Sequence, residues 1–281
     1  MTRLAPVDAA PPITPEDPAP LRFTSEDGAR CYAVHVQMPQ RTPPPAGFPV
    51  LYVLDGAAAR LAIQADPGLR DLPVVVATVA HAHDPEATKA ARAYDYTPPA
   101  PDGSPIVDPR VPAWRAGGAD AFLDVLDTHI RPAVQARHPV DPGRAVLAGH
   151  SYGGLCVLHA LCGQRGYAGY VSASPSIWWR DEAILTRIAA LAAAPVRPAA
   201  RVCLLVGAQE AWHAQALGQD GTPGSRHGGE PTAPAAQALA AYLSGIPELD
   251  VTFTSLAGEA HGTMAVAAAR AAVRLAATLS G

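Results

Sequence analysis

The chain has 281 residues, of which 49% are hydrophobic and only 16% are charged, and its formal net charge is −4. A chain of this length and apolar content can bury a large core within one domain. The slightly acidic balance and the lack of any dense Lys/Arg run argue against nucleic acid or an anionic membrane as the main partner.

The N-terminal end differs in composition from the rest. Residues 1–20 contain six prolines and no apolar run of signal-peptide length, so we predict a flexible Pro-rich segment there. No stretch of the sequence is apolar over the length needed to span a bilayer. We therefore expect a single domain over residues 21–281, in a cytoplasmic protein or, if the start is not native, a periplasmic one.

From residue 21 onward, apolar β-branched runs alternate with helical periods. Strands are expected over residues 30–37, 49–54, 73–79, 145–148, 169–172, 201–206 and 251–256. Helices are expected over residues 120–137, 152–162, 181–193, 233–243 and 263–279. The apolar runs suit strands that are covered on both faces of a mostly parallel sheet. The alternation predicts an α/β fold with right-handed crossovers and helices on both faces.

One segment does not fit this alternation. Residues 80–118 carry many prolines and no clear period. Connections of that length in compact domains are usually functional or disordered. We expect a long loop that lies over the carboxyl ends of the strands, where such sheets bind ligands.

The chemistry of the chain is indicated by Gly149-His-Ser151-Tyr-Gly153, a G-x-S-x-G sequence between an expected strand and an expected helix. The bare pattern is common, but the strand–turn–helix context is that of a nucleophile elbow, in which glycines let the backbone close around a strained serine. The sequence therefore predicts Ser151 as a nucleophile.

A serine hydroxyl needs a base, and the order expected along the chain is serine, acid, histidine. His261 follows the last expected strand and precedes the final helix, which makes it the predicted base. Glu210 directly follows the penultimate strand and is the preferred orienting acid, while Asp220 and Glu230 in the same loop are the alternatives. His213 and His227 also lie in that loop but lack the context of His261.

An oxyanion hole needs one backbone N–H from the residue after the nucleophile, Tyr152, and another from the loop after the third strand. That loop begins at Asp55, so Gly56 or Ala57 is the expected second donor. Because backbone groups do this, the sequence leaves the choice between them open.

Metal and redox chemistry have little support. His81-Ala-His83-Asp84 resembles a set of metal ligands, but no further ligands stand nearby and an H-x-H pair in a loop is usually solvated. We predict no metal and no organic cofactor. The cysteines lack disulfide or metal spacing, so we expect all four to be small buried apolar side chains: Cys31, Cys156, Cys162 and Cys203.

With these motifs placed, the sequence from about residue 47 to the C-terminus resembles the siderophore-esterase branch of the α/β-hydrolases. The matching runs are PVLYVLDG at residues 49–56, RAYDYTP at 92–98, GGADAFL at 117–123, GHSYGGL at 149–155, SPSIWW at 174–179, GAQE at 207–210 and AHG at 260–262. The resemblance implies the α/β-hydrolase fold and ester hydrolysis. Relatives often carry a polar residue where this chain has Ala57, and some work with a Ser–His dyad, which is the alternative to a role for Glu210.

In that family the RAYDYTP run borders the pocket, which makes Arg92 and Tyr96 candidate substrate-binding residues. Arg92 would engage an anionic catecholate or ferric siderophore, or else it forms a structural ion pair with Asp95. Trp178 and Trp179 must face different ways, and one of them could line an apolar acyl pocket.

These observations predict a serine hydrolase that cleaves the ester or lactone bonds of a catecholate siderophore. A small-molecule ester, with iron arriving only as part of the substrate, is the expected partner. The alternatives with the same machinery are a general carboxylesterase, a thioesterase or an acyltransferase. A non-catalytic binding protein of the same fold is the alternative of another class, although such proteins usually lack the serine or the histidine, and this chain has both.

Overall fold

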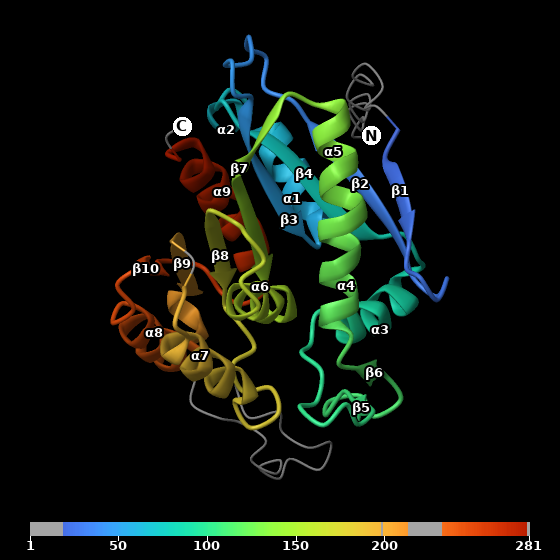
Figure 1. Cartoon of the computed structure of the whole chain (residues 1–281), viewed down its shortest axis with the longest axis vertical. Coiled ribbons are helices and arrows are strands. Elements are labelled where there is room, and N and C mark those ends of the chain that lie inside the picture. Colours follow the sequence, from blue (N-terminus) through green and yellow to red (C-terminus); the bar gives the residue numbers. More distant parts are fainter. Residues whose placement is uncertain (1–18, 198, 213–231, 280–281) are drawn as a thin grey trace, which may run out of the picture.

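The structure is a computed structural model that describes residues 19–197, 199–212 and 232–279 (Figure 1). Its strands are β1 (Leu21–Thr24), β2 (Cys31–Gln37), β3 (Phe48–Leu54), β4 (Val75–His81), β5 (Ile106–Val107), β6 (Arg115–Ala116), β7 (Val140–His150), β8 (Gly169–Ala173), β9 (Ala200–Gly207) and β10 (Leu249–Leu256). Its helices are α1 (Gly56–Ala65), α2 (Pro67–Arg70), α3 (Pro85–Asp95), α4 (Ala119–Val125), α5 (Arg131–Arg137), α6 (Tyr152–Cys162), α7 (Ala183–Ala193), α8 (Thr232–Leu243) and α9 (Met264–Ala277), with the π-helical turn η1 (Leu126–Ile130) and the 3-10 turn η2 (Ala208–Trp212).

Within these residues, eight strands form one mixed sheet in the order β1-β2-β4-β3-β7-β8-β9-β10. Strands β1, β2 and β4 pair antiparallel, whereas β4, β3 and β7 to β10 run parallel. The chain builds the sheet in one direction from β3 to β4 and in the other direction from β7 to β10. Ligands bind at such a switch point, at the carboxyl ends of the strands, which here means the ends of β3 and β7.

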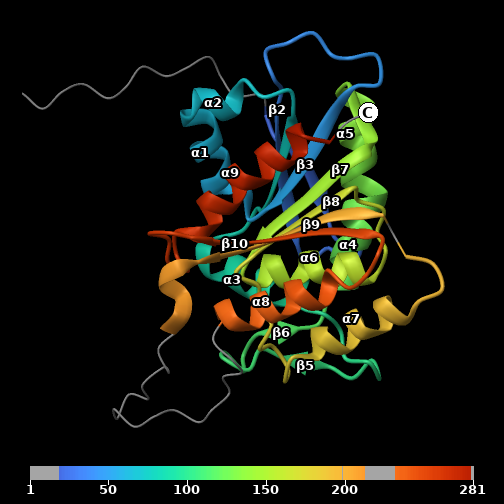
Figure 2. The ribbon, with the colours of Figure 1, turned by 90° about the vertical axis from the view of Figure 1, so that its left-hand side faces the viewer.

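Both faces of the sheet are covered, as the apolar runs predicted. Side chains alternate along β3, so that Val50 and Tyr52 join the core on one face and Leu51 and Val53 join the core on the other. Helices α1, α2 and α9 cover one face, and α4 to α6 cover the opposite one (Figure 2). The final helix has the predicted amphipathic character, because its small apolar side chains are buried while Arg270 is exposed. This two-sided burial confirms the predicted α/β class.

The predicted helix over residues 120–137 contains a π turn that the sequence explains. Its apolar stripe is Phe122, Leu126, Ile130 and Val134, which recur at every fourth residue. In a regular α-helix a four-residue step overshoots one turn by about 40°, so such a stripe would drift around the helix. The wider turn η1 lies in the middle of this stripe, and all four side chains are at most 1% exposed. The π turn therefore keeps the stripe on the core.

The expectation of a long loop over residues 80–118 is wrong. The segment contains α3 and the short β5–β6 hairpin. Asp84 is the N-cap of helix α3, since its carboxylate accepts hydrogen bonds from the amides of Glu86 and Ala87, and Pro85 lies in the first turn. Asp followed by Pro and Glu is a helix-start signal. The helix was not predicted because the many prolines farther along the segment indicated a loop. Strand β1 and helices α1 and α2 were also not predicted.

The cysteines only partly match expectation. All four are free, and Cys156 and Cys203 are buried, but Cys31 and Cys162 are partly exposed. Among the residues that the structure describes, no helix has the length and apolar character required to cross a membrane.

Candidate active site

The residues predicted as nucleophile, base and acid come together in one hydrogen-bonded chain. The Ser151 hydroxyl lies 3.1 Å from Nε2 of His261, and Nδ1 of His261 lies 2.9 Å from Oε2 of Glu210. A carboxylate can only accept, so Nδ1 carries the proton and Nε2 is left to accept from the serine. Ser151 follows β7, Glu210 lies in η2 after β9, and His261 follows β10. All three therefore sit at the carboxyl ends of parallel strands.

Ser151 is held in a conformation that few side chains adopt. Its φ and ψ are 59° and −116°, and it links the end of β7 to the first residue of α6. A Cβ at Gly149 would overlap the carbonyl of Gly153, so the turn can close only because residue 149 is a glycine. Strained backbone of this kind is typical of functional sites, and here it presents the hydroxyl at the start of a helix.

Both carboxylate oxygens of Glu210 accept hydrogen bonds from neighbouring groups. Besides His261, it accepts hydrogen bonds from the Ser174 hydroxyl at 2.5 Å and from the Gly207 amide at 2.8 Å. Burial opposes ionisation, but the bonds from His261, Ser174 and Gly207 outweigh it, so the pKa of Glu210 lies below its usual value. Glu210 is therefore an ionised, fixed acceptor. The alternatives Asp220 and Glu230, like His213 and His227, lie outside the described residues.

Two residues that carried no predicted role also line the site. The hydroxyl of Ser176 lies 3.4 Å from that of Ser151, and its amide donates to the Ser151 carbonyl. The ring of His150 lies 4.6 Å from that of His261, centre to centre. Burial, together with the nearby His261, lowers the pKa of His150 to about 4, so this imidazole is neutral near pH 7. Ser176 lies in the SPSIWW run and His150 in the GHSYGG run, so the motifs contained both.

The expected oxyanion donors lie at the N-termini of two neighbouring helices. Gly56 and Ala57 begin α1 directly after β3, and Tyr152 begins α6. The first amides of a helix have no partner within it and attract negative charge. The two helix starts are adjacent, since a Cβ added to Gly153 would lie 3.7 Å from the Asp55 carboxylate. Gly56 must be a glycine, because a Cβ there would overlap the side chain of Thr78 on β4.

Arg92 does not pair with Asp95. Its Nε and Nη2 atoms lie 2.7 and 2.6 Å from the two carboxylate oxygens of Asp55, and its side chain is only 28% exposed. Asp95 is instead completely buried and is bound by Arg30, His81 and Tyr32, each at 2.8 Å. The guanidinium of Arg92 thus braces the β3–α1 turn that holds the predicted oxyanion donors.

The other predicted substrate-binding residues divide into accessible and inaccessible ones. Tyr96 is completely buried beneath Arg92 and Trp179 is 1% exposed in the core, so neither can contact a substrate from these positions. The sequence could not reveal this, since aromatic side chains suit a pocket and a core equally well. Trp178 is partly exposed and packs against Tyr152, with ring centres 6.2 Å apart.

Each member of the possible metal trio has a structural partner. His81 bonds to Asp95, His83 accepts from the Cys31 amide at 3.1 Å, and Asp84 caps α3. Neighbouring elements therefore account for all three side chains.

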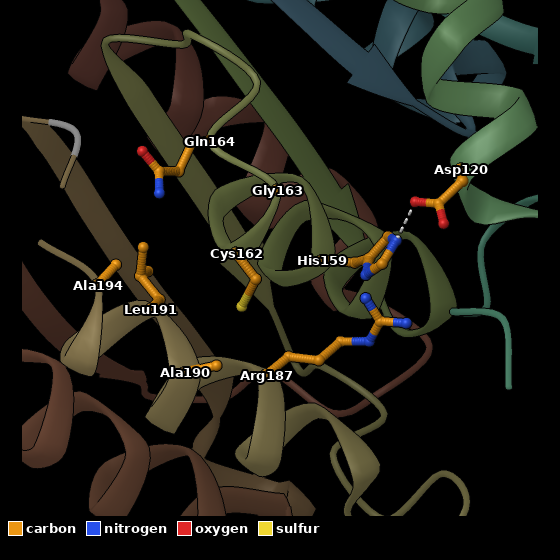
Figure 3. A pocket seen from close by; sticks show the side chains of 9 residues that line it. All are labelled: Asp120, His159, Cys162, Gly163, Gln164, Arg187, Ala190, Leu191 and Ala194. Carbon is orange, nitrogen blue, oxygen red and sulfur yellow. Dashed lines mark hydrogen bonds and ion pairs between the residues drawn. The ribbon is translucent and has the colours of Figure 1, made fainter. Parts of the chain in front are cut away.

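A separate cavity of about 250 Å³ lies at the far end of α6, between that helix and α7 (Figure 3). Its walls include Asp120, His159, Cys162 and Arg187. His159 and Asp120 are joined by a 2.7 Å hydrogen bond at one side of it. No member of the Ser151–His261–Glu210 chain lines this cavity, so it is distinct from the candidate active site.

Comparisons with known proteins identify the family and the fold of the chain. The model of the family described as "Putative esterase" matches residues 25–227, which is most of the chain. The chain therefore belongs to this esterase family, and its fold is that of the α/β-hydrolases.

Its similarity to siderophore esterases is confirmed by individual relatives. The chain is 36% identical over 173 residues to the apo-salmochelin esterase of Escherichia coli O6:H1, and the match covers 60% of this chain and 54% of that protein. It is 29% identical over 175 residues to the ferri-bacillibactin esterase BesA of Bacillus subtilis, covering 59% of this chain and 60% of BesA. The matches thus span about half to three fifths of these two relatives. The solved structure of the siderophore hydrolase EstA from Aspergillus nidulans aligns over 98% of this chain and 100% of EstA, with a TM-score of 0.75 and 25% identity.

Proposed function

We propose that this protein is a serine hydrolase that cleaves ester or lactone bonds of a catecholate siderophore. The observation that carries the proposal is the continuous chain from Ser151 through His261 to Glu210, with contacts of 3.1 and 2.9 Å. The esterase family and the siderophore esterases among the relatives support ester cleavage and the class of substrate.

The reaction follows from the positions of the groups. The Ser151 oxygen attacks the ester carbonyl while Nε2 of His261 takes the hydroxyl proton. The developing oxyanion is stabilised by the amides of Tyr152 and of Gly56 or Ala57, at the two helix N-termini. His261 then protonates the leaving alkoxide, and the acyl group stays on Ser151.

The second half of the cycle uses the same residues with water as the nucleophile. His261 deprotonates the water, the tetrahedral intermediate collapses, and the serine is released with its proton restored. Throughout, the ionised Glu210 fixes the tautomer of His261 and stabilises the imidazolium that forms. These steps use protein groups and water alone, and iron enters as cargo of the substrate.

Labelling and turnover together test the proposal. A fluorophosphonate probe should label wild-type protein and leave Ser151→Ala unlabelled, and a mass spectrum should place the adduct on Ser151. The variant should lose several orders of magnitude in kcat and keep its melting temperature, since the substitution removes a single oxygen atom and leaves the backbone of the turn unchanged. If Ser151→Ala kept more than a tenth of wild-type kcat, the serine mechanism would be wrong.

The substrate class is tested separately, by the masses of the products after incubation with enterobactin and its ferric complex. Hydrolysis of p-nitrophenyl acetate without cleavage of either siderophore would leave a general carboxylesterase, thioesterase or acyltransferase. If the protein is neither labelled by the probe nor active on any of these esters, it is a binding protein of the same fold.

A further inference from the structure

An anionic substrate needs a positively charged side chain in the site, and Arg92 is already paired with a carboxylate. A ferric catecholate is a large anion, yet the chain has a net charge of −4, so attraction needs a local positive group with donors to spare. The Nε–Nη2 edge of the Arg92 guanidinium is occupied by the two carboxylate oxygens of Asp55, at 2.7 and 2.6 Å. A cation held in this way is largely neutralised.

Arg110, in the turn between β5 and β6, has the opposite character. Its guanidinium lies 4.4 Å from the ring centre of Tyr152 and 5.4 Å from that of Trp178. Its side chain is 53% exposed, and its contact with a carboxylate, Asp108, is 3.7 Å long. One face of the guanidinium therefore rests on aromatic rings while most of its donors remain open.

The backbone of this turn is fixed rather than loose. Asp108 is completely buried, and one of its oxygens accepts from the amides of Arg110 and Val111 at 2.8 and 3.2 Å. Its other oxygen accepts from the Tyr152 hydroxyl at 2.7 Å. Asp108 thus ties the turn that carries Arg110 directly to the helix that begins at the nucleophile.

Each of the two rings beneath Arg110 is close in sequence to a residue of the candidate active site. Tyr152 follows Ser151, and Trp178 lies two residues after Ser176, whose hydroxyl is 3.4 Å from that of Ser151. Figures 1 and 2 both show the β5–β6 hairpin at the lower end of the molecule, below α6. The cation therefore borders the site in which the substrate reacts.

We propose that Arg110, stacked on Tyr152 and Trp178, is the subsite that binds the aromatic, anionic ring of the substrate, and that Arg92 is a brace for the oxyanion turn. A guanidinium matches such a ring well, because it stacks on the ring plane and donates to phenolate or carboxylate oxygens at its edge. The inference rests on the proposed function for its substrate, but the subsite itself can be tested with a ligand that is not cleaved.

The test uses 2,3-dihydroxybenzoate as a competitive inhibitor of p-nitrophenyl acetate hydrolysis. Arg110→Gln should raise its inhibition constant about ten-fold, which corresponds to roughly 1.4 kcal/mol. The matched control is Arg115→Gln, which removes an exposed arginine of the same hairpin that lies over Tyr94 instead. This control should leave the inhibition constant within two-fold of the wild-type value. Melting curves of both variants confirm that each is folded.

Two results would overturn the assignment. The first is an inhibition constant that does not change in Arg110→Gln, or that changes equally in Arg115→Gln. The second is an equal rise for cyclohexanecarboxylate, which carries the charge without the aromatic ring. If the inhibitor result holds but enterobactin is not cleaved by the wild type, the subsite stands and the siderophore proposal fails. If enterobactin is cleaved, Arg110→Gln should raise its KM more than it lowers kcat.

Discussion

Replacing Glu210 with glutamine tests whether the acid orients the base. The two oxygens of Glu210 have different partners: Oε2 accepts from His261, and Oε1 accepts from Ser174 and from the Gly207 amide. The Gly207 amide can only donate, so the glutamine carbonyl must remain there and its NH2 group must face Nδ1 of His261. Nδ1 would then have to accept, which moves the imidazole proton to Nε2.

An imidazole protonated at Nε2 cannot accept the proton of Ser151. Loss of the correct tautomer in a serine–histidine–acid site lowers kcat by about 10³–10⁴-fold, or about 4–5.5 kcal/mol of transition-state stabilisation. We therefore expect Glu210→Gln to lose at least about 10³-fold in kcat. The expected change in the KM of p-nitrophenyl acetate is small, because the carboxylate does not touch the substrate.

The assay is the steady-state hydrolysis of p-nitrophenyl acetate, with Glu259→Gln as the control. Glu259 lies two residues before His261 and belongs to no hydrogen bond of the catalytic chain through its side chain, so its variant should stay close to wild type. Asp220→Asn and Glu230→Gln belong in the same series. Retention of more than a tenth of wild-type kcat by Glu210→Gln would refute the orienting role and leave a dyad. Inactivity of Glu230→Gln alone would mean that a different carboxylate is the acid.

Three further predictions concern residues around this chain. Gly149→Ala should lose about 1–3 kcal/mol of stability as well as activity, because the new methyl group overlaps the Gly153 carbonyl. The pKa of His150 falls from 6.5 to about 4 on folding, so its neutral form contributes stability above pH 6.5 that is lost as the pH falls toward 4. Urea unfolding measures the free energy of unfolding at each pH. Between pH 6.5 and pH 4, this free energy should fall by up to about 3 kcal/mol less in His150→Gln than in the wild type. Arg92→Ala should lower kcat/KM for p-nitrophenyl acetate and for enterobactin by similar factors, on the order of ten-fold, since it releases Asp55 at the oxyanion turn.

Each of these predictions has an outcome that contradicts it. Gly68→Ala is a control for the glycine, since a Cβ there meets only the Asp66 carboxylate, at 3.3 Å. A Gly149→Ala protein as stable as this control would show that the turn can relax. Identical pH dependence in wild type and His150→Gln would mean that His150 titrates normally. If Arg92→Ala lowered kcat/KM for enterobactin but not for p-nitrophenyl acetate, Arg92 would be a substrate-binding residue.

The order and positions of Ser151, Glu210 and His261, which the structure brings together in one hydrogen-bonded chain, could be predicted because the signals for them are local. Ser151 and His261 were identified by the elements directly before and after them, and Glu210 by its position after β9. The buried strands of the sheet could also be predicted, since they are short apolar runs. Helix α3 could have been found as well, because Asp84 and Pro85 mark its start.

What escaped prediction depends on packing between distant segments. Arg92 pairs with Asp55, 37 residues away, rather than with Asp95 three residues away, because α3 turns its Arg92 side toward the β3–α1 turn. Arg110 shows no motif, and its position over Tyr152 follows from a carboxylate, Asp108, that is 44 residues from that tyrosine. Local patterns cannot reveal such partners, since the contacts exist only once the sheet has formed.

The position of His261 has a consequence for how the proposed activity would be lost on warming. Among the strands that the structure describes, β10, which leads to His261, is the last in the sheet and pairs with β9, and its side chains are mostly half-buried or exposed. Ser151, by contrast, lies between the central strand β7 and a fully packed helix. Edge elements open with less free energy than the core does. Partial detachment of β10 would separate His261 from Ser151 while most of the core stayed intact, so inactivation on warming should precede global unfolding.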